Sequence, residues 1–331
     1  MTRRAIAVTA IGESLVDIVV PAHGGVRVEH PGGSPMNVAL GLARLNRTVS
    51  LVTHVGSDAR GSAIIRHLEK AGVTLAAGSI RDEPSSTATA HVKADGSADY
   101  VFDLRWSLPT GLASSDRSLA GSDIVHVGSI GAFLEPGGST VVSLLEQLVA
   151  SDDPPLISFD PNVRPSIVPD HGAALRRFER IAAVATAVKL SDEDAEWLYP
   201  GRDLESVADH ILQLGAGLVA TTLGGDGALM STRTIRLAVP GFPVDVADTI
   251  GAGDSFMSAL IDCIARSLEE GASAESLRDG HAFDQDLLAS TGEFAALCAA
   301  VTVSRPGADP PRRSELDDAR RTLVPRGTDV T

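Results

Sequence analysis

The segment Asp248–Phe256, DTIGAGDSF, combines a glycine-rich turn with an acidic residue at the start of a predicted helix. Gly251 and Gly253 permit a tight turn that leaves backbone amides uncovered, and a helix N-terminus adds unpaired N–H groups and a partial positive charge. With Ala252 between them, these amides form a cradle suited to a phosphoryl group in transfer. Asp254 stands in the first helical turn, where its carboxylate can accept the proton of an attacking hydroxyl. A plain N-terminal capping Asp would leave the same pattern.

A second glycine-rich segment, Pro31–Asn37 (PGGSPMN), also opens a predicted helix. Gly32 and Gly33 allow a ligand to approach the backbone closely, and Asn37 offers both donors and acceptors. Asp17 is an acidic residue among apolar neighbours in the strand-like sequence LVDIVVP. Such groups suit a neutral polyol, whose hydroxyls need donors and acceptors. A simple helix start and an exposed strand position are the alternative interpretations.

Three further polar segments follow predicted strands: Asp160–Arg164 (DPNVR), Lys189–Asp194 (KLSDED) and Thr222–Gly227 (TLGGDG). Polar groups at the carboxyl ends of parallel strands are well placed to face a ligand. The acids of KLSDED could hold Mg²⁺ through water, or Ser191 and Asp194 could form an imperfect capping box. TLGGDG could lie under the phosphates of a nucleotide, although a tight turn explains it equally well. The sequence contains no GxxxxGK[ST] motif, which excludes an ordinary P-loop.

Short apolar runs that alternate with helical stretches must position these residues. The predicted strands are Ala5–Ile11, Val49–Val55, Ile124–Val127, Leu156–Phe159, Ala187–Leu190 and Leu218–Thr222. Each is nearly continuous in apolar residues, which is typical of a strand buried on both faces. Helical stretches such as Met36–Leu45 lie between them, so the sequence predicts an α/β fold with a mostly parallel sheet covered on both faces.

Two strand-like segments, Leu15–Pro21 and Thr87–Asp103, interrupt this alternation. The ADGS sequence at Ala94–Ser97 predicts a hairpin turn within the second segment. We expect a small antiparallel sheet that serves as a lid or an oligomer contact, the alternative being edge strands of the main sheet. Residues 267–292 predict a surface helix pair and loop, and a short helix around Ser314–Leu323 should precede a loose tail.

The composition of the 331 residues, 44% hydrophobic and 21% charged, allows a substantial core in one large α/β domain. The net charge of −15 argues against nucleic-acid binding, which needs clustered Lys and Arg. Cys263 and Cys298 lie in apolar helical patterns and predict buried thiols, not a disulfide or a metal site. With no signal-peptide pattern and no apolar run of ~20 residues, we expect a cytoplasmic protein without membrane contact.

Taken together and in this order, the motifs make the chain resemble the ribokinase-like (PfkB) carbohydrate kinase family, closest in appearance to bacterial fructokinases. Two stretches carry the resemblance: Gly32–Gly72, from GGSPMNVALGLARLN through HVGSDARGSAIIRHLEKAG, and Asp248–Ile261, DTIGAGDSFMSALI. The resemblance covers roughly residues 5–312. It implies a single ribokinase-like kinase domain, a three-layer α/β sandwich with a mostly parallel central sheet. A small β-sheet lid would be formed by about 14–30 and 86–108, with a C-terminal tail at 313–331.

The resemblance also implies roles for individual residues. Asp254 would be the catalytic base, and Gly251, Ala252 and Gly253 the anion hole. Sugar would bind between lid and core, through Asp17, Gly32, Gly33, Asn37, Arg105, Asn162 and Arg164, with Trp106 beside Arg105 in the lid. ATP would lie along the strand ends, through Lys189, Thr222, Gly224, Gly225, Gly227 and Gly307.

Two ions enter through the same resemblance. The family often carries Asn-x-x-Glu for Mg²⁺ positioning, and Asp194 stands here in place of the Glu, so we expect it to hold Mg²⁺ through water. Many members bind K⁺ beside the anion hole through groups equivalent to Asp248, Ile250 and Gly307. A Ser often completes that loop, whereas this chain has Pro311, so K⁺ activation is a hypothesis.

The activity that the resemblance implies is ATP-dependent phosphorylation of a sugar hydroxyl, most closely that of D-fructose, with lid strands that could pair across a homodimer. The alternatives within the class are 2-keto-3-deoxygluconate kinase, ribokinase and nucleoside kinase. A keto acid would need a cation, which Arg105 or Arg164 could supply, and a nucleoside would need an aromatic shelf, for which the chain offers mainly Tyr100, Phe102 and Trp106. A non-catalytic sugar-binding regulator on the same fold is the alternative of another class, and the intact GAGD sequence counts against it.

Overall fold

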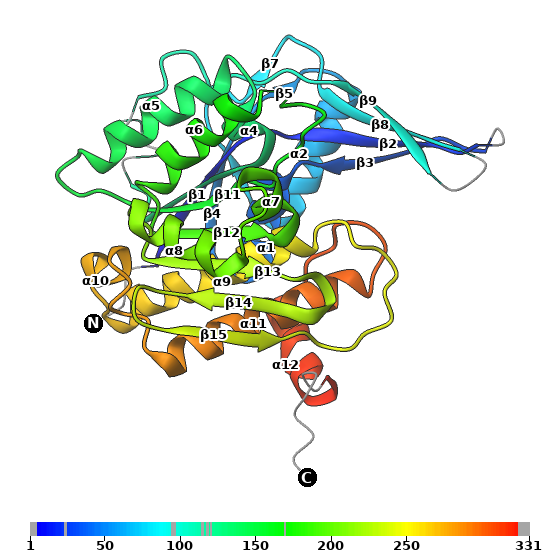
Figure 1. Cartoon of the computed structure of the whole chain (residues 1–331). Helices are drawn as coiled ribbons and strands as arrows, with labels where there is room; N and C mark the ends of the chain where they lie inside the picture. Colours follow the sequence, from blue (N-terminus) through cyan, green and yellow to red (C-terminus); the bar gives the residue numbers. More distant parts are fainter. Residues whose placement is uncertain are drawn as a thin grey trace.

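A nine-stranded sheet forms the centre of the structure, a computed structural model that describes residues 5–22, 25–93, 97–113, 116, 119, 121–168 and 170–323 (Figure 1). In spatial order the strands are β15 (Arg236–Pro240), β14 (Gly227–Ser231), β13 (Leu218–Thr222), β12 (Ala187–Ser191), β11 (Leu156–Asp160), β10 (Ile124–Gly128), β1 (Ala7–Ile11), β4 (Thr48–Val52) and β6 (Thr74–Leu75). The strands from β13 to β6 run parallel, and β14 and β15 are antiparallel additions at one edge. The predicted mostly parallel sheet is therefore confirmed.

Helices cover both faces of this sheet and enclose two separate apolar cores. On one face lie α1 (Ser34–Arg44), α2 (Ala59–Ala71), α9 (Ala252–Glu270), α10 (Ala274–Arg278), α11 (Gln285–Val303) and α12 (Arg313–Thr322). On the other lie α4 (Ser129–Phe133), α5 (Gly137–Val149), α6 (His171–Ala182), α7 (Asp192–Leu198) and α8 (Leu204–Leu214). Because the inner strands pack against helices on both sides, their sequences are mostly apolar. This three-layer arrangement is the predicted one.

The predicted strand Val49–Val55 is divided in the structure. β4 stops short of its end, and a separate strand, β5 (Val55–Gly56), pairs with β7 (Ile80–Arg81) in a two-stranded sheet. Between them Thr53 leaves the main ladder, because its backbone N–H donates to the hydroxyl of Ser79 instead. The strand-like sequence of Val49–Val55 does not reveal this change of hydrogen-bond partner.

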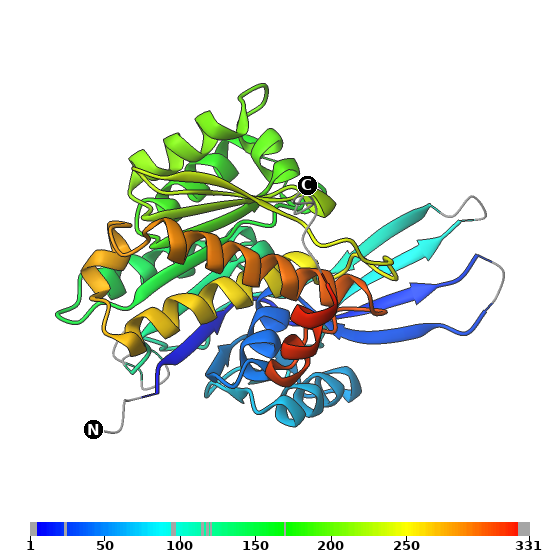
Figure 2. The same ribbon diagram turned by 90° about the horizontal axis from the view of Figure 1, so that it is seen from below.

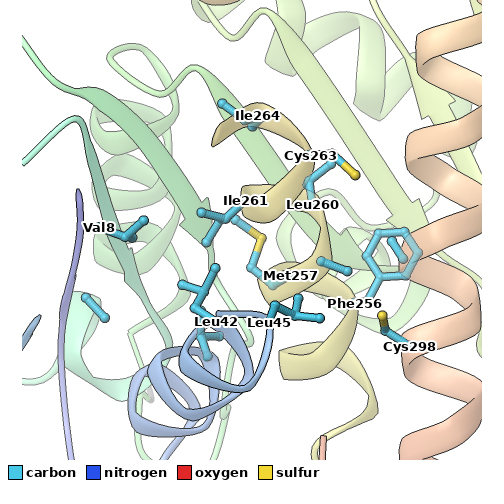
Figure 3. Packing of buried hydrophobic residues seen from close by; sticks show 14 of the residues in the cluster. Val8, Leu42, Leu45, Phe256, Met257, Leu260, Ile261, Cys263, Ile264 and Cys298 are labelled. Carbon is cyan, nitrogen blue, oxygen red and sulfur yellow. The ribbon is translucent and has the colours of Figure 1, made fainter. Parts of the chain in front are cut away.

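The helices α1 and α9 pack against each other over the sheet. Leu42 of α1 lies beside Met257 and Ile261 of α9 in the larger core (Figure 3). The first turns of α9 and α1 are thereby held at the same end of the sheet. This packing brings two segments more than 200 residues apart into one site, as the hydrogen bonds described below show.

The helix α11 runs alongside α9 (Figure 2). By length and composition it could cross a membrane, with a mean hydropathy of 1.4, although the sequence contains no unbroken apolar run of that length. Most of its apolar window, 61%, is buried inside the protein, which is the pattern of a core helix. Cys298 on α11 and Cys263 on α9 are buried free thiols, as predicted (Figure 3).

A second sheet of four strands projects from the body of the molecule (Figures 1 and 2). Its order is β3 (Val28–Gly32), β2 (Leu15–Val20), β8 (Ser86–Val92) and β9 (Ala98–Asp103). The prediction of a small separate sheet is confirmed, and the alternative of edge strands is wrong. The sheet is not wholly antiparallel, because β2 and β8 pair in parallel after a long connection through α1 and α2. Of the predicted turn at Ala94–Ser97, residues 94–96 lie outside the described residues.

The C-terminal part of the chain follows its sequence pattern. The helix α12 confirms the one predicted around Ser314–Leu323, and residues 324–331 of the predicted tail lie outside the described residues. Residues 267–292 form the end of α9, the short helix α10, a turn and the start of α11, which is the predicted helix pair and loop.

Candidate active site

A cavity of about 690 Å³ opens at the carboxyl ends of β11, β12 and β13. Residues from the DPNVR, KLSDED, TLGGDG and GAGD segments line it. They are Asn162, Arg164, Lys189, Asp194, Thr222, Gly224, Gly225, Gly227, Gly251, Ala252, Gly253 and Asp254. Apolar side chains, among them Phe242 and Val244 after β15 and Ala296 and Ala300 on α11, line it as well. The segments converge because parallel strands end at the same edge of a sheet.

Asp254 lies in the first turn of α9, and its side chain is almost fully buried. The hydroxyl of Ser34 donates to its Oδ1 at 2.5 Å, and the amide Nδ2 of Asn37 donates to its Oδ2 at 2.8 Å. The N-cap of α9 is Gly251, whose φ of 79° favours glycine, and no side chain caps this helix end. Asp254 is therefore not the capping residue that the sequence allowed. Its carboxylate is held by the first turn of α1 and lines the cavity.

Lys189 lies on β12 against the glycine-rich loop. Its ammonium donates to Asp160 Oδ2 at 3.0 Å, and both side chains are buried. A Cβ at Gly253 would stand only 2.8 Å from Lys189 Nζ, so a larger residue would push the ammonium away. The glycine at this position therefore permits a cation to approach the start of α9.

Asp17 on β2 belongs to the same region, although it does not line the cavity. A Cβ at Gly32 would overlap its Oδ2, so a larger residue there would displace this carboxylate. Burial raises the pKa of Asp17 to about 6; His30 opposes the rise, Asp254 adds to it and Arg164 opposes it. The predicted sugar-binding residues therefore interact electrostatically with the predicted base.

Glu13 is a buried carboxylate that no motif indicated. Its Oε2 accepts a hydrogen bond from the Gly131 N–H at 2.7 Å, at the start of α4. Burial raises the pKa of Glu13 to about 7, although hydrogen bonds from its own backbone, Gly131 and Ser129 oppose the rise, and Asp254 adds to it. An acidic residue directly after a strand, in Gly12–Glu13, is a signal that could have been read.

Two predicted lid contacts are not found in the cavity. The guanidinium of Arg105 pairs with Asp103 at 2.8 Å, and its backbone bonds to the hydroxyl of Ser86. Trp106 was expected beside it as a sugar contact, and this is wrong, because its ring is 3% exposed and its Nε1 donates to the Gly131 carbonyl at 2.8 Å. An aromatic residue next to a polar one looks the same in sequence whether it faces a ligand or the core.

The predicted ion-binding residues are occupied by protein hydrogen bonds. Asp194 forms the capping box of α7 with Ser191, and its Oδ1 also accepts from the Val163 N–H at 2.7 Å. Asp248 accepts from the N–H groups of Ile250 at 3.0 Å and Gly307 at 2.9 Å. Among the residues that the structure describes, no group of three His, Cys, Asp or Glu side chains is arranged to hold a metal ion.

Comparison with known proteins gives a consistent result. The family profile described as pfkB family carbohydrate kinase matches residues 6–315. Fructokinase-1 of Oryza sativa subsp. japonica is 31% identical over 333 residues, which cover 96% of this chain and 98% of the relative. Fructokinase of Rhizobium leguminosarum bv. trifolii is 32% identical over 234 residues, which cover 70% of this chain and 71% of the relative.

Solved structures share the fold over nearly the whole length. A double mutant of fructokinase from Vibrio cholerae O395, in fructose, ADP and potassium ion bound form, has a TM-score of 0.79 and 26% identity, covering 96% of this chain and 99% of that one. Fructokinase with bound ATP from Xylella fastidiosa has a TM-score of 0.80 and 24% identity, covering 96% and 98%.

Proposed function

Because the chain belongs to the pfkB family of carbohydrate kinases, we propose that it transfers the terminal phosphoryl group of ATP to a hydroxyl of D-fructose. The fructokinase relatives in sequence, and the related structure with fructose and ADP bound, support this pair of substrates. The observation that carries the proposal is the carboxylate of Asp254, held by Ser34 and Asn37 at the glycine-rich start of α9.

In this proposal the reacting hydroxyl lies between Asp254 and the γ-phosphate. Asp254 accepts the hydroxyl proton as the sugar oxygen attacks phosphorus in line. Ser34 and Asn37 donate to the carboxylate and fix its orientation, so that a remaining lone pair can face the sugar. The amides of Gly251–Gly253 and the start of α9 stabilise the charge on the phosphoryl oxygens.

The nucleotide would occupy the cavity along the strand ends. The triphosphate would lie over Thr222 and the glycines of η1 (Gly224–Asp226) and Gly227, whose backbone permits close approach. The apolar end of the cavity, lined by residues such as Phe242 and Ala300, would take the base, whereas Gly307, also predicted to contact ATP, is not among the residues that line the cavity.

The charge of the acceptor region favours a neutral sugar over a keto acid. The charge of Asp254 raises the pKa of both Glu13 and Asp17. Arg164, which lines the cavity, opposes the rise at Asp17 together with His30. Arg105, the other candidate partner for a substrate carboxylate, is paired with Asp103. A substrate carboxylate would meet like charges, which cost binding free energy. This supports fructose over 2-keto-3-deoxygluconate.

Two ions belong to the proposal. Asp194 lines the cavity but already accepts protein hydrogen bonds, so it would contact Mg²⁺ through water while the nucleotide phosphates supply the direct ligands. Mg²⁺ bound there neutralises phosphate charge. K⁺ would lie near Asp248, Ile250 and Gly307, which hydrogen bonds already draw together beside the start of α9. The potassium ion bound form of the Vibrio cholerae fructokinase supports the inclusion of K⁺ in this proposal.

The small sheet would serve as a lid over the acceptor. It carries Asp17 on β2, and it is joined to the core where β2 follows β1 and where β3 leads into α1. Closure would exclude water from the transferring phosphoryl group and limit hydrolysis of ATP.

Replacement of the base tests the proposal. Asp254→Asn keeps the shape of the side chain but removes its ability to take a proton, so kcat with fructose and ATP should fall by about 10²–10⁴-fold. Calorimetry should show that fructose still binds. Asp284→Asn is the matched control. Asp284 caps α11 through its side chain, and an Asn at this position can do the same, so kcat should equal that of the wild type.

A kcat of Asp254→Asn within tenfold of the wild type would exclude Asp254 as the base. A wild-type protein that binds fructose and ATP without turnover would instead favour the regulatory alternative on the same fold.

A further inference from the structure

Asp160 and Lys189 form an ion pair on the sheet face that α9 covers. They stand on neighbouring parallel strands, β11 and β12, with Lys189 Nζ 3.0 Å from Asp160 Oδ2. The Lys189 side chain is 5% exposed and the Asp160 side chain is 0% exposed. Asn162 and Arg164 of the same DPNVR segment have predicted roles, whereas Asp160 has none.

The ammonium of Lys189 faces the site of phosphoryl transfer. A Cβ at Gly253 would stand 2.8 Å from this ammonium and would displace it, and Lys189 lines the cavity together with Asp254. Burial opposes the charge, but Asp160, Asp194 and Asp254 together raise the pKa of Lys189 above its usual value. A permanent positive charge therefore stands beside the glycine-rich loop.

Among the polar residues beside Lys189 on this sheet face, Asp160 supplies the negative charge. Ser158 lies two residues earlier on the same face of β11, and His126 of β10 places Nδ1 3.2 Å from its hydroxyl. Burial and the charge of Lys189 lower the pKa of His126 to about 3, so the imidazole is neutral. Within the described part of the chain, Asp160 Oδ1 has no hydrogen-bond partner. The position of the ammonium thus depends on one carboxylate oxygen.

We propose that Asp160 is a positioning residue for phosphoryl transfer, holding the Lys189 ammonium beside the Gly251–Gly253 loop, where it neutralises charge on the moving phosphoryl group. The inference rests on the proposed kinase function. As the sugar oxygen bonds to phosphorus, the bond from phosphorus to the β–γ bridging oxygen breaks, and its electron pair leaves with ADP. Asp254 takes the hydroxyl proton. Asp160 and Lys189 exchange no proton in this step and supply a fixed charge.

Asp160→Asn tests the proposal by removing the negative charge at nearly constant shape. Lys189 then loses the carboxylate that accepts its hydrogen bond, and its pKa should fall, because Asp194 and Asp254 supply only part of the charge that opposes the effect of burial. We expect kcat at pH 7 to fall about 100-fold, with the KM for sugar changed less than about threefold. We also expect kcat of the variant to decline from pH 7 to pH 9 relative to that of the wild type. A purely structural ion pair would not alter the pH profile.

A double-mutant comparison tests whether Asp160 acts through Lys189. Lys189→Met should lose as much kcat as Asp160→Asn, and the combined Asp160→Asn/Lys189→Met variant should lose no more. The combined variant has no unpaired buried charge, so it keeps the test available if Asp160→Asn does not fold. A combined variant that is tenfold slower than Lys189→Met would overturn the proposal.

Asp262→Asn is the matched control for loss of a buried carboxylate. Asp262 lies on α9 outside the cavity lining and pairs with Arg47 and Arg313, so its replacement should lower stability and keep the wild-type pH profile of kcat. A folded Asp160→Asn with a kcat within threefold of the wild type and the same pH profile would overturn the proposal.

Failure of the proposed function is distinguishable from failure of this inference. If the wild type phosphorylates no sugar, calorimetry of ATP binding from pH 6 to pH 9 still decides it. Alkaline loss of ATP affinity in Asp160→Asn alone supports the positioning role, and equal profiles contradict it.

Discussion

Burial of an ionisable side chain in this site disfavours its charged form, and Glu13 is the example. The carboxylate of Glu13 is 3% exposed and feels the charge of Asp254, so its ionised form is disfavoured in the folded protein. Gly131 offsets part of this cost by donating to its Oε2. A group of this kind makes the stability of the protein depend on pH.

Glu13→Gln should change the pH dependence of stability. The folded pKa of Glu13, about 7, lies above its unfolded value of 4.5, so the folded state holds a proton that the unfolded state releases within this window. The free energy of unfolding of the wild type should therefore fall as pH rises from 4.5 to 7, by on the order of 3 kcal/mol from this group. Gln carries no such proton, and urea unfolding at pH 5 and pH 8 should show the variant gaining stability relative to the wild type at pH 8.

An exposed carboxylate provides the comparison for this measurement. Glu146→Gln removes a surface partner of Arg180 and should follow the wild type at both pH values. An equal stability difference between Glu13→Gln and the wild type at pH 5 and pH 8 would show that Glu13 does not titrate in this window.

The residues of the site were predictable where a local pattern carries them. The GAGD sequence predicts the start of a helix with an acidic residue in its first turn, and the structure has both. The hydrogen bonds from Ser34 and Asn37 to Asp254 were not predictable, because they join positions 220 and 217 residues apart through the packing of α1 on α9. The pairing of Asp160 with Lys189 likewise depends on which strands are neighbours in the sheet.

At the scale of elements, the small sheet exposes an apolar row. Val28, Val19, Ala90 and Tyr100 are cross-strand partners from β3 to β9, so their side chains share one face. Tyr100 is 63% exposed and stacks on Phe102. Contiguous exposed apolar side chains on a soluble surface are typical of an interaction site.

We propose that this row pairs two copies of the chain. Sedimentation equilibrium should show a dimer for the wild type, and Tyr100→Lys should shift it to monomer, because a charge would be buried in the contact. Ile80→Lys on β7 replaces another exposed apolar residue, 51% exposed and outside the row, and should remain dimeric. A monomeric wild type, or a dimeric Tyr100→Lys, would contradict the proposal.

Strand positions were predictable from apolar runs, but pairing was not. β13 has the predicted bounds, because both faces of Leu218–Thr222 are covered. The antiparallel pair β14 and β15 was missed, since exposed and buried residues mix in its edge strand. The parallel pairing of β2 with β8 depends on how the intervening core folds, which no local pattern records.

For the whole molecule, the net charge of −15 must be reconciled with binding of a polyanionic nucleotide. The site does so locally, with backbone amides at the start of α9 and the Lys189 ammonium, while the surface remains acidic. The acceptor side instead gathers carboxylates. The molecule therefore separates a phosphate-binding side from a side suited to neutral hydroxyl groups.

The most direct test is ADP release with ATP and Mg²⁺ in the presence of D-fructose, D-ribose, 2-keto-3-deoxygluconate or adenosine. We predict the highest kcat/KM for D-fructose, at least about tenfold above that for the keto acid, whose carboxylate would face Asp17 and Asp254. Turnover that favours 2-keto-3-deoxygluconate, or no turnover with any of the four, would contradict the account.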